Sequence, residues 1–404
     1  MIRPISLFLI TCILLADYLT ATIVKGAGVL AIILLVIIPV VAIVLSPKVQ
    51  RKNYGIEILT FTILIAWSMA LLMFGWLEYV KAILGENFLL VKFGTLLPVL
   101  LSLSLLWWLT SPIKSRIAWV SHRLRCDVFL LFVPLFILWG VRDVVWRYYG
   151  SDASQDAMFI ALIALIIFSP IVIRCILCAR ELTDKNLTQL LLQVARRAGV
   201  KKAKVLVWNT HMLLMNAFAI GIIFQPKTIV LTDKLLQNLT QKELVLVARH
   251  EFAHHRYWHL SFLIIGMFCT ILWTDHLATL FQLDIGAVTT QLIQLLLVIM
   301  MYIYLSRKFE EQADAYAVAD ESASQGSEIV LQDASHNMSA ALCAIASCSN
   351  ISTDRRDVLH GSIRERQLNL ESLVHCPLNA IPIHQSVKWI KIALVSLLLL
   401  EFVI

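Results

Sequence analysis

Charged side chains are scarce in this sequence, since Asp, Glu, Lys and Arg make up only 15% of its 404 residues. Soluble domains carry about 25%. Hydrophobic residues, in contrast, reach 59% of the chain. This composition excludes an ordinary soluble globular protein, because water is a poor solvent for so much apolar surface.

The sequence also lacks the features of several other protein classes. Its eight cysteines show neither a paired disulfide framework nor zinc-ribbon spacing. No basic stripe alternates with aromatic residues, so the formal net charge of +7 does not indicate a nucleic-acid partner. No internal repeat and no low-complexity linker divides the chain. We therefore expect no nucleic-acid binding and no disulfide scaffold.

The sequence does contain a series of apolar runs, each close to the ~20 residues that a membrane-spanning helix needs. They lie near residues 4–23, 27–46, 55–76, 88–110, 127–146, 157–178, 261–281, 286–305 and 388–404. Asp17 interrupts the first run, and the last run is short. The pattern predicts a mainly α-helical, multi-pass membrane protein with about eight or nine spans.

Basic residues concentrate in alternate loops between these runs, and such loops face the cytosol. The loop after the second run contains Lys48, Arg51 and Lys52, whereas the loop after the fifth combines Arg147 with Asp152. The alternation predicts that the amino terminus and the polar segment from residue 178 onward are cytosolic. We expect the protein to lie in a plasma membrane, the inner membrane of a bacterium.

Residues 179–260 form a polar stretch between the apolar runs. Helical spacing of apolar residues predicts a helix over residues 187–198, and β-branched and aromatic residues predict strands over 205–208, 216–224 and 228–231. A short helix is expected near residues 233–239. The runs 261–281 and 286–305 form a hairpin, after which a polar insertion near residues 321–358 separates two helical pieces.

The most informative motif is His250-Glu251-Phe252-Ala253-His254. Two histidines four residues apart project from one face of a helix and can bind one zinc ion, and the glutamate between them can take a proton from water. Thr240 and Glu243 form a capping box that starts this helix. His255 and His259 repeat the spacing without a following glutamate, and they remain an alternative pair of ligands.

A third ligand is expected from the far end of the hairpin. His254 lies seven residues before its first span, and Glu310 lies five residues after its second. At ~1.5 Å per residue, both stand about 10 Å from the same membrane face. Asp314, one turn beyond Glu310, can accept a hydrogen bond from a ligand histidine. The alternative is that both are solvated acids beside Arg307 and Lys308.

These blocks resemble the membrane zinc metallopeptidase family of HtpX and the CAAX prenyl protease. The order H-E-x-x-H followed by S-R-x-x-E-x-x-A-D at residues 306–314 is similar to the family pattern, and residues 309–317 are especially similar to the prenyl-protease version. Residues 216–221 resemble the family's edge strand N-A-[FY]-A…G. Residues 360–366 resemble its H-P-S-x-x-x-R segment, with Gly361 in place of proline. The resemblance spans about residues 179–370, and no counterpart is identified for the first six runs.

Carried over residue by residue, the resemblance implies one zinc ion per chain bound by His250, His254 and Glu310. It makes Glu251 the general base, and Asp314 a catalytic residue that supports the site. The predicted organisation is a six-span membrane domain over residues 1–178, a small α+β zinc-peptidase domain over 179–387 that contains the transmembrane hairpin 261–305, and a C-terminal transmembrane segment over 388–404.

The resemblance also implies a strand that binds the substrate, and a strand edge can hold an extended peptide by main-chain hydrogen bonds. Its residues are Asn216, Ala217, Phe218 and Ala219. His360 and Arg366 are candidates for supporting the site or stabilising the oxyanion, with a helix-surface arginine as the alternative for Arg366.

We therefore expect an integral-membrane zinc endopeptidase that cleaves membrane or membrane-associated proteins at the cytosolic face. Its expected partners are protein or peptide substrates and membrane lipids. The sequence indicates neither the physiological substrate nor the oligomeric state. Two alternatives remain open. One is a sensor peptidase of the penicillin-receptor type, and the other is a non-enzymatic receptor or transporter with a vestigial metal site.

Overall fold

The computed structural model describes residues 4–19, 28–49, 55–85, 87–222, 226–281, 287–349 and 351–401. The chain divides into two compact units, an N-terminal unit (Met1–Ile166) and a C-terminal unit (Ile167–Ile404). The described residues are mainly helical, as the sequence predicts.

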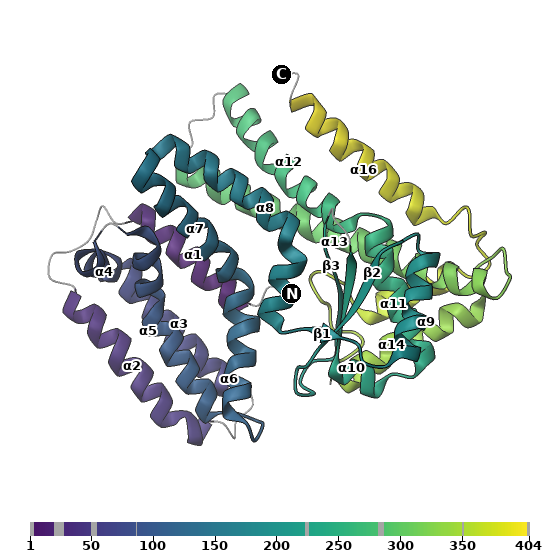
Figure 1. The fold of residues 1–404 in the computed structure, drawn as a ribbon, viewed down its shortest axis with the longest axis horizontal. Helices are drawn as coiled ribbons and strands as arrows, with labels where there is room; N and C mark the ends of the chain where they lie inside the picture. Colours follow the sequence, from purple (N-terminus) through teal and green to yellow (C-terminus); the bar gives the residue numbers. More distant parts are fainter. Residues whose placement is uncertain are drawn as a thin grey trace. The chain divides into compact units, whose positions relative to one another are not determined.

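The described part of the N-terminal unit is a bundle of helices (Figure 1). Its elements are α1 (Pro4–Leu19), α2 (Gly28–Val49), α3 (Gly55–Leu72), α4 (Trp76–Leu84), α5 (Phe88–Leu109), α6 (Arg116–Leu124), a π-helical turn (Arg125–Phe129), α7 (Leu130–Tyr149) and the first part of α8 (Ser151–Leu177). Trp67, Trp107 and Phe132 are almost fully buried in its core. Asp143 of α7 accepts a hydrogen bond from the backbone N–H of Phe88 (3.1 Å) and so caps α5.

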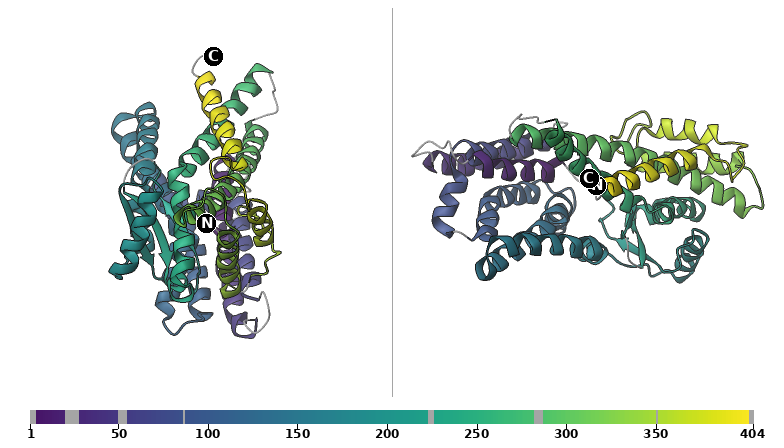
Figure 2. Two further views of the ribbon diagram at one scale, coloured as in Figure 1. Left: turned by 90° about the vertical axis from the view of Figure 1, so that its right-hand side faces the viewer. Right: turned by 90° about the horizontal axis from the view of Figure 1, so that it is seen from above.

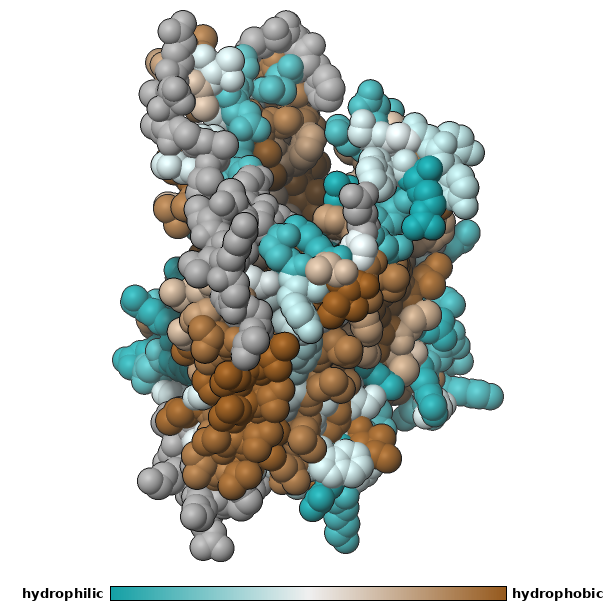
Figure 3. Space-filling model, turned by 90° about the vertical axis from the view of Figure 1, so that its left-hand side faces the viewer, coloured by the Kyte–Doolittle hydropathy of each residue, from teal (hydrophilic) through white to brown (hydrophobic). Residues whose placement is uncertain are grey.

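Several helices expose apolar side chains instead of polar ones. In α2, Leu30, Val36 and Val44 are 51%, 54% and 67% exposed. Figure 3 shows apolar side chains gathered over a broad area of one face of the molecule. Such a surface is unfavourable in water and matches the acyl chains of a lipid bilayer.

Among the described residues, seven helices are long and apolar enough to cross a membrane. They are Gly55–Leu72, Phe88–Leu109, Arg116–Tyr149, Ser151–Leu177, His259–Leu280, Thr289–Ser324 and Pro382–Glu401. A shorter apolar helix covers Leu30–Ser46. The membrane character of the chain agrees with the sequence analysis, whereas the number of spans remains a prediction.

A four-stranded sheet lies in the C-terminal unit, with the strand order β1-β2-β4-β3. β2 (Ala203–Trp208) and β4 (Lys227–Thr232) are parallel and agree with the predicted strands, while β1 (Arg180–Glu181) and β3 (Ala217–Ile220) are antiparallel strands at the two edges. β3 is shorter than predicted because Gly221, at a φ of 107°, ends it. Residues 223–225 of the predicted strand lie outside the described residues. β1 was not predicted, because two residues are too few for a periodic pattern.

The helices predicted around the sheet are present as α9 (Lys185–Arg197) and α10 (Asp233–Asn238). The segment near residues 321–358 differs from the polar insertion that the sequence analysis expected between two helical pieces, because it contains a helix of its own, α14 (Gln332–Cys348). Many of the residues in this helix are small or polar, so its apolar stripe is weak in the sequence. The stripe includes Ala334, Met338 and Leu342, which are buried.

Two long helices carry the predicted site. α11 (Gln241–Arg256) begins with the predicted capping box of Thr240 and Glu243. α12 (His259–Leu280) and α13 (Ala287–Ser324) form the predicted hairpin, and α16 (Pro382–Glu401) packs against both of its helices (Figures 1 and 2). α13 continues without a break from the apolar run to Glu310 and beyond, so the predicted span and the predicted ligand lie on one continuous helix.

Candidate metal centre

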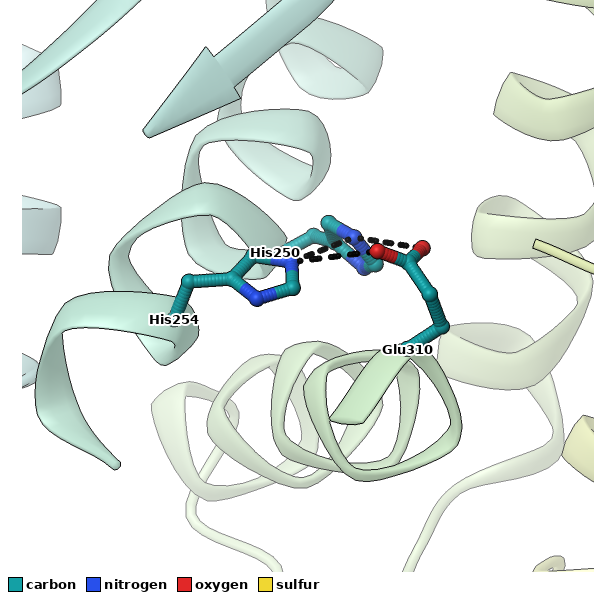
Figure 4. A group of neighbouring side chains, drawn as sticks. All are labelled: His250, His254 and Glu310. Atoms are coloured by element: carbon teal, nitrogen blue, oxygen red, sulfur yellow. Dashed lines mark hydrogen bonds and ion pairs between the residues drawn. The ribbon is translucent and has the colours of Figure 1, made fainter. Parts of the chain in front are cut away.

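His250, His254 and Glu310 meet where α11 packs against α13. Figure 4 shows the two imidazoles and the carboxylate pointing toward one another. The Nε2 atoms of the two histidines are 3.3 Å apart. Glu310 Oε2 lies 3.4 Å from Nε2 of His250, and Glu310 Oε1 lies 3.5 Å from Nε2 of His254. One carboxylate therefore closes a triangle with two imidazole nitrogens.

This triangle has the dimensions of a zinc site. Ligand atoms about 2.0–2.1 Å from zinc in a tetrahedron lie roughly 3.4 Å from one another. The three measured separations are 3.3, 3.4 and 3.5 Å. Within the described part of the chain this is the one group of at least three His, Cys, Asp or Glu side chains that could hold a metal ion. The donor set of two imidazoles and one carboxylate leaves a fourth position open, as in catalytic zinc sites.

The second nitrogen of His250 is held by an acid. Nδ1 of His250 lies 2.8 Å from Oδ1 of Asp314. Arg366 of α15 (Ile363–Ser372) donates to both oxygens of Asp314, from Nε at 2.7 Å and from Nη2 at 2.6 Å. A proton on Nδ1 of His250 leaves the lone pair of Nε2 for the metal. Asp314 thus lies where the sequence analysis expected a supporting acceptor.

The alternative pair, His255 and His259, does not converge on a common point. Nε2 of His255 lies 3.0 Å from the carbonyl oxygen of Thr228 in β4. Nδ1 of His259 lies 2.9 Å from Nδ1 of His254. The two rings therefore have different partners.

Burial and charge set the protonation of the metal-free site. Burial opposes a charge on His250, but hydrogen bonds to Asp314 and Glu310 outweigh it and raise the pKa of His250 to about 10. Burial lowers the pKa of His254 to about 3. Without a metal, a proton on His250 therefore faces Glu310, and a cation that binds here must displace it.

Glu251 is 7% exposed and lies on α11 between the two histidines. Burial raises the pKa of Glu251 to about 7. A carboxylate with a pKa near neutrality can both accept and return a proton at physiological pH.

His360 and Arg366 both lie near the ligand carboxylate. His360 Nε2 is 3.8 Å from Oε1 of Glu310, and its Nδ1 is 3.0 Å from Oδ1 of Asp357. Arg366 Nη2 is 3.9 Å from Oε2 of Glu310. Gly361 has a φ of 74°, which proline cannot adopt, so this turn differs from the proline-containing family segment. The oxyanion role of His360 and Arg366 remains a prediction.

The register of β3 directs the backbone of two of the four predicted substrate-binding residues toward β4 and that of the other two toward the open edge of the sheet. The backbone N–H of Thr232 donates to the carbonyl of Asn216 (3.0 Å), so this pair is hydrogen-bonded across the strands. Because such pairs alternate in antiparallel strands, Phe218, opposite Val230, also bonds to β4. The backbone groups of Ala217 and Ala219 therefore point to the open edge.

Sequence analysis missed several residues around the centre. Asp357 orients His360, and Gln312 lies 2.9 Å from His259. His259 was considered only as a partner of His255. Its contact with His254 was missed, because residues five apart do not share a helix face. Asp357 lies in the segment interpreted as an insertion, and only its acidic side chain beside His360 could have indicated it.

A model of peptidase family M48 matches residues 181–340. The match contains the strand edge, both histidines and Glu310. Residues 181–340 belong to peptidase family M48. The resemblance that the motifs indicated is thereby confirmed.

Two proteins named protease HtpX homolog are similar in sequence to part of this chain. The one from Archaeoglobus fulgidus is 28% identical over 149 residues, which are 36% of this chain and 43% of that protein. The one from Thermoplasma acidophilum is 24% identical over 217 residues, 49% of this chain and 68% of that protein. The match thus spans less than half the length of the first relative.

The crystal structure of S. mikatae Ste24p has a similar fold, with a TM-score of 0.54 and 16% sequence identity. The match covers 86% of this chain and 99% of that chain. A match of this extent goes beyond the M48 segment and includes helices of the N-terminal unit. The sequence analysis identified no counterpart for the first six runs, and this likeness is one of fold at only 16% sequence identity. Apolar residues replace one another readily in such helices, so the fold persists where the sequence does not.

Proposed function

We propose that the protein is a zinc-dependent endopeptidase of the membrane that hydrolyses peptide bonds of membrane or membrane-associated proteins at the cytosolic face. The observation that carries the proposal is the triangle of His250, His254 and Glu310, whose ligand atoms lie 3.3–3.5 Å apart. The M48 segment favours this function over a sensor peptidase of the penicillin-receptor type. The buried Glu251 beside the triangle favours it over a vestigial metal site.

Zinc in this site would polarise the scissile carbonyl and make a water molecule more acidic. Glu251 accepts the proton of that water and delivers it to the leaving amine. Asp314 and Arg366 hold His250 in the orientation that presents Nε2. The open edge of β3 aligns the peptide in an extended conformation beside Glu251.

Removal of the metal tests this proposal directly. We expect about one zinc ion per purified chain, loss of hydrolysis of an unfolded membrane-protein substrate after chelation, and recovery when zinc is added. Elemental analysis should find no zinc in His254→Ala, whereas the control His255→Ala should retain it, because His255 bonds to Thr228 instead. Stoichiometric zinc in His254→Ala would contradict the ligand assignment. A zinc-loaded wild-type chain that hydrolyses no peptide would contradict the proposed peptidase activity.

Ala219→Pro is expected to abolish hydrolysis without loss of zinc. The substitution removes the backbone N–H that points to the open edge, and proline is tolerated at an edge where that group has no partner in the sheet. Phe218→Pro should instead disrupt the pairing with β4 and lower stability. Ala219→Val, which keeps the N–H, is the matched control. Wild-type hydrolysis in Ala219→Pro would show that the edge does not hold substrate.

Single cysteines on opposite sides of the membrane test the predicted topology. Gln325 and Asp152 are both exposed, and each can be replaced in a chain whose exposed Cys175 and Cys178 are changed to serine. Because basic loops face the cytosol, an impermeant thiol reagent added from outside should label Asp152→Cys and spare Gln325→Cys. Equal labelling of both would contradict the cytosolic site.

A further inference from the structure

His254 has a second partner besides the metal centre. Its Nδ1 lies 2.9 Å from Nδ1 of His259, the first residue of α12. His259 Nε2 lies 2.9 Å from Oε1 of Gln312 on α13, and Gln312 Nε2 lies 3.1 Å from Nδ1 of His384, in the first turn of α16. His259 is 1% exposed and Gln312 is 3% exposed, so water does not compete for these contacts. We call this chain of hydrogen bonds the His259 relay.

The relay has one consistent direction. The amide oxygen of Gln312 only accepts, so His259 donates from Nε2 and carries a lone pair on Nδ1. That lone pair accepts the Nδ1–H of His254 and leaves Nε2 of His254 for the metal. The amide nitrogen of Gln312 only donates, and it does so to Nδ1 of His384. Every hydrogen bond of the relay therefore has one donor and one acceptor while all of its side chains are uncharged.

A backbone turn allows the contact between His254 and His259. On a continuous helix, residues five apart point about 140° away from each other. α11 ends at Arg256, and Trp258 adopts a left-handed backbone, with φ at 56°, before α12 begins. A left-handed backbone is unfavourable for a bulky residue, so the surrounding contacts must hold Trp258 in it. The turn brings the ring of His259 back to His254, where it also stacks on Phe309 with 4.4 Å between centroids.

We propose that His259 is the positioning residue of the ligand His254, and that Gln312 and His384 hold His259 in place. The inference rests on the proposed function, because it assumes a metal at the triangle. The relay sets the tautomer and the ring plane of His254, as Asp314 does for His250. It also links α16 to the metal centre, through His384.

Charge explains why the two ligand histidines have unlike partners. The carboxylate of Asp314 is balanced by Arg366, 2.6 Å away. A carboxylate in place of His259 would add a second negative charge beside the metal, and this would weaken the pull of the metal on a carbonyl oxygen. A neutral acceptor fixes the ring of His254 and leaves the charge of the site unchanged.

Zinc affinity of the full chain, measured by competition with a chelator, tests the relay. His259→Leu removes the acceptor and should weaken zinc binding about 10- to 100-fold. His259→Asn places an amide oxygen near the position of Nδ1 and should restore most of the affinity. His259→Gln reaches only the position of Nε2 and should restore less. With cobalt in place of zinc, the visible absorption bands should change in His259→Leu and return in His259→Asn.

His255→Leu is the matched control, because it removes a neighbouring buried histidine that bonds to Thr228. It should keep the wild-type affinity. If His259→Leu does not fold, Gln312→Met interrupts the relay one step further out and should weaken zinc binding several-fold. Wild-type affinity in either relay variant, or equal losses in the Leu, Asn and Gln variants of His259, would overturn the relay. A wild-type chain that binds no zinc would instead overturn the proposed function itself.

Discussion

Glu251→Gln is expected to abolish peptide hydrolysis while the chain keeps its zinc. The substitution preserves the shape of the side chain and removes the group that accepts the proton. We expect kcat to fall by a factor on the order of 100 or more, which corresponds to at least ~2.7 kcal/mol of activation free energy. Single-turnover hydrolysis and zinc content, measured on one preparation, check both halves of this result.

Acid should inactivate the wild-type chain by protonating Glu251. Burial raises the pKa of Glu251 to about 7 in the metal-free chain, and a bound dication would lower it. The acid limb of kcat/KM should therefore lie at or below pH 7 in the wild-type protein, and Glu251→Gln should lack it. Hydrolysis by Glu251→Gln at the wild-type rate would exclude this residue as the base.

Glu311→Gln is the matched control for this variant. Glu311 follows the predicted ligand Glu310 on α13, and its side chain is 34% exposed beside Lys308, 2.9 Å away. The same chemical change there should leave zinc content and hydrolysis at wild-type levels, because an exposed pair contributes little.

Arg366→Gln is expected to destabilise the C-terminal unit by on the order of 3–5 kcal/mol. The side chains of Arg366 and Asp314 are only 15% and 6% exposed, and two hydrogen bonds join them. Without the guanidinium, the buried carboxylates of Asp314 and Glu310 lose their balancing charge. The thermal unfolding midpoint in detergent should fall by roughly 10 °C. Added zinc should recover part of the loss, since it binds the folded state and supplies positive charge.

Arg364→Gln is the matched control on the same helix. Arg364 pairs with Asp354 at 3.2 Å, but their side chains are 70% and 64% exposed. Such a pair contributes about 0–1 kcal/mol, so the midpoint should scarcely change. Equal midpoints for Arg366→Gln and the wild-type chain would contradict a stabilising role for the buried pair.

The clustering of His250, His254 and Glu310 was predictable because much of its geometry is local in the chain. The spacing of His250 and His254 places both on one helix face, and the capping box at Thr240 marks where that helix begins. The short hairpin fixes the height of Glu310 relative to them. These three features need only helical periodicity and chain length.

The remaining features depend on contacts that periodicity does not reveal. His259 reaches His254 only because Trp258 leaves the helical conformation. Arg366 reaches Asp314 across 52 residues of sequence. The register of β3 with β4 decides which residues of β3 direct their backbone groups to the open edge. A shift by one residue would exchange these residues with those that bond to β4. The fold of the N-terminal unit was hidden because its apolar residues are interchangeable.

α13 is a single helix of 38 residues, about 57 Å long. Glu310 and Asp314 therefore cannot be adjusted independently of the membrane segment in the same helix. One residue inserted between Leu305 and Glu310 would turn the carboxylate by about 100° and move it by about 1.5 Å, whereas a ligand on a loop would absorb the change. Under the proposed function, α13 therefore fixes the distance from the bilayer at which a peptide bond can be cleaved.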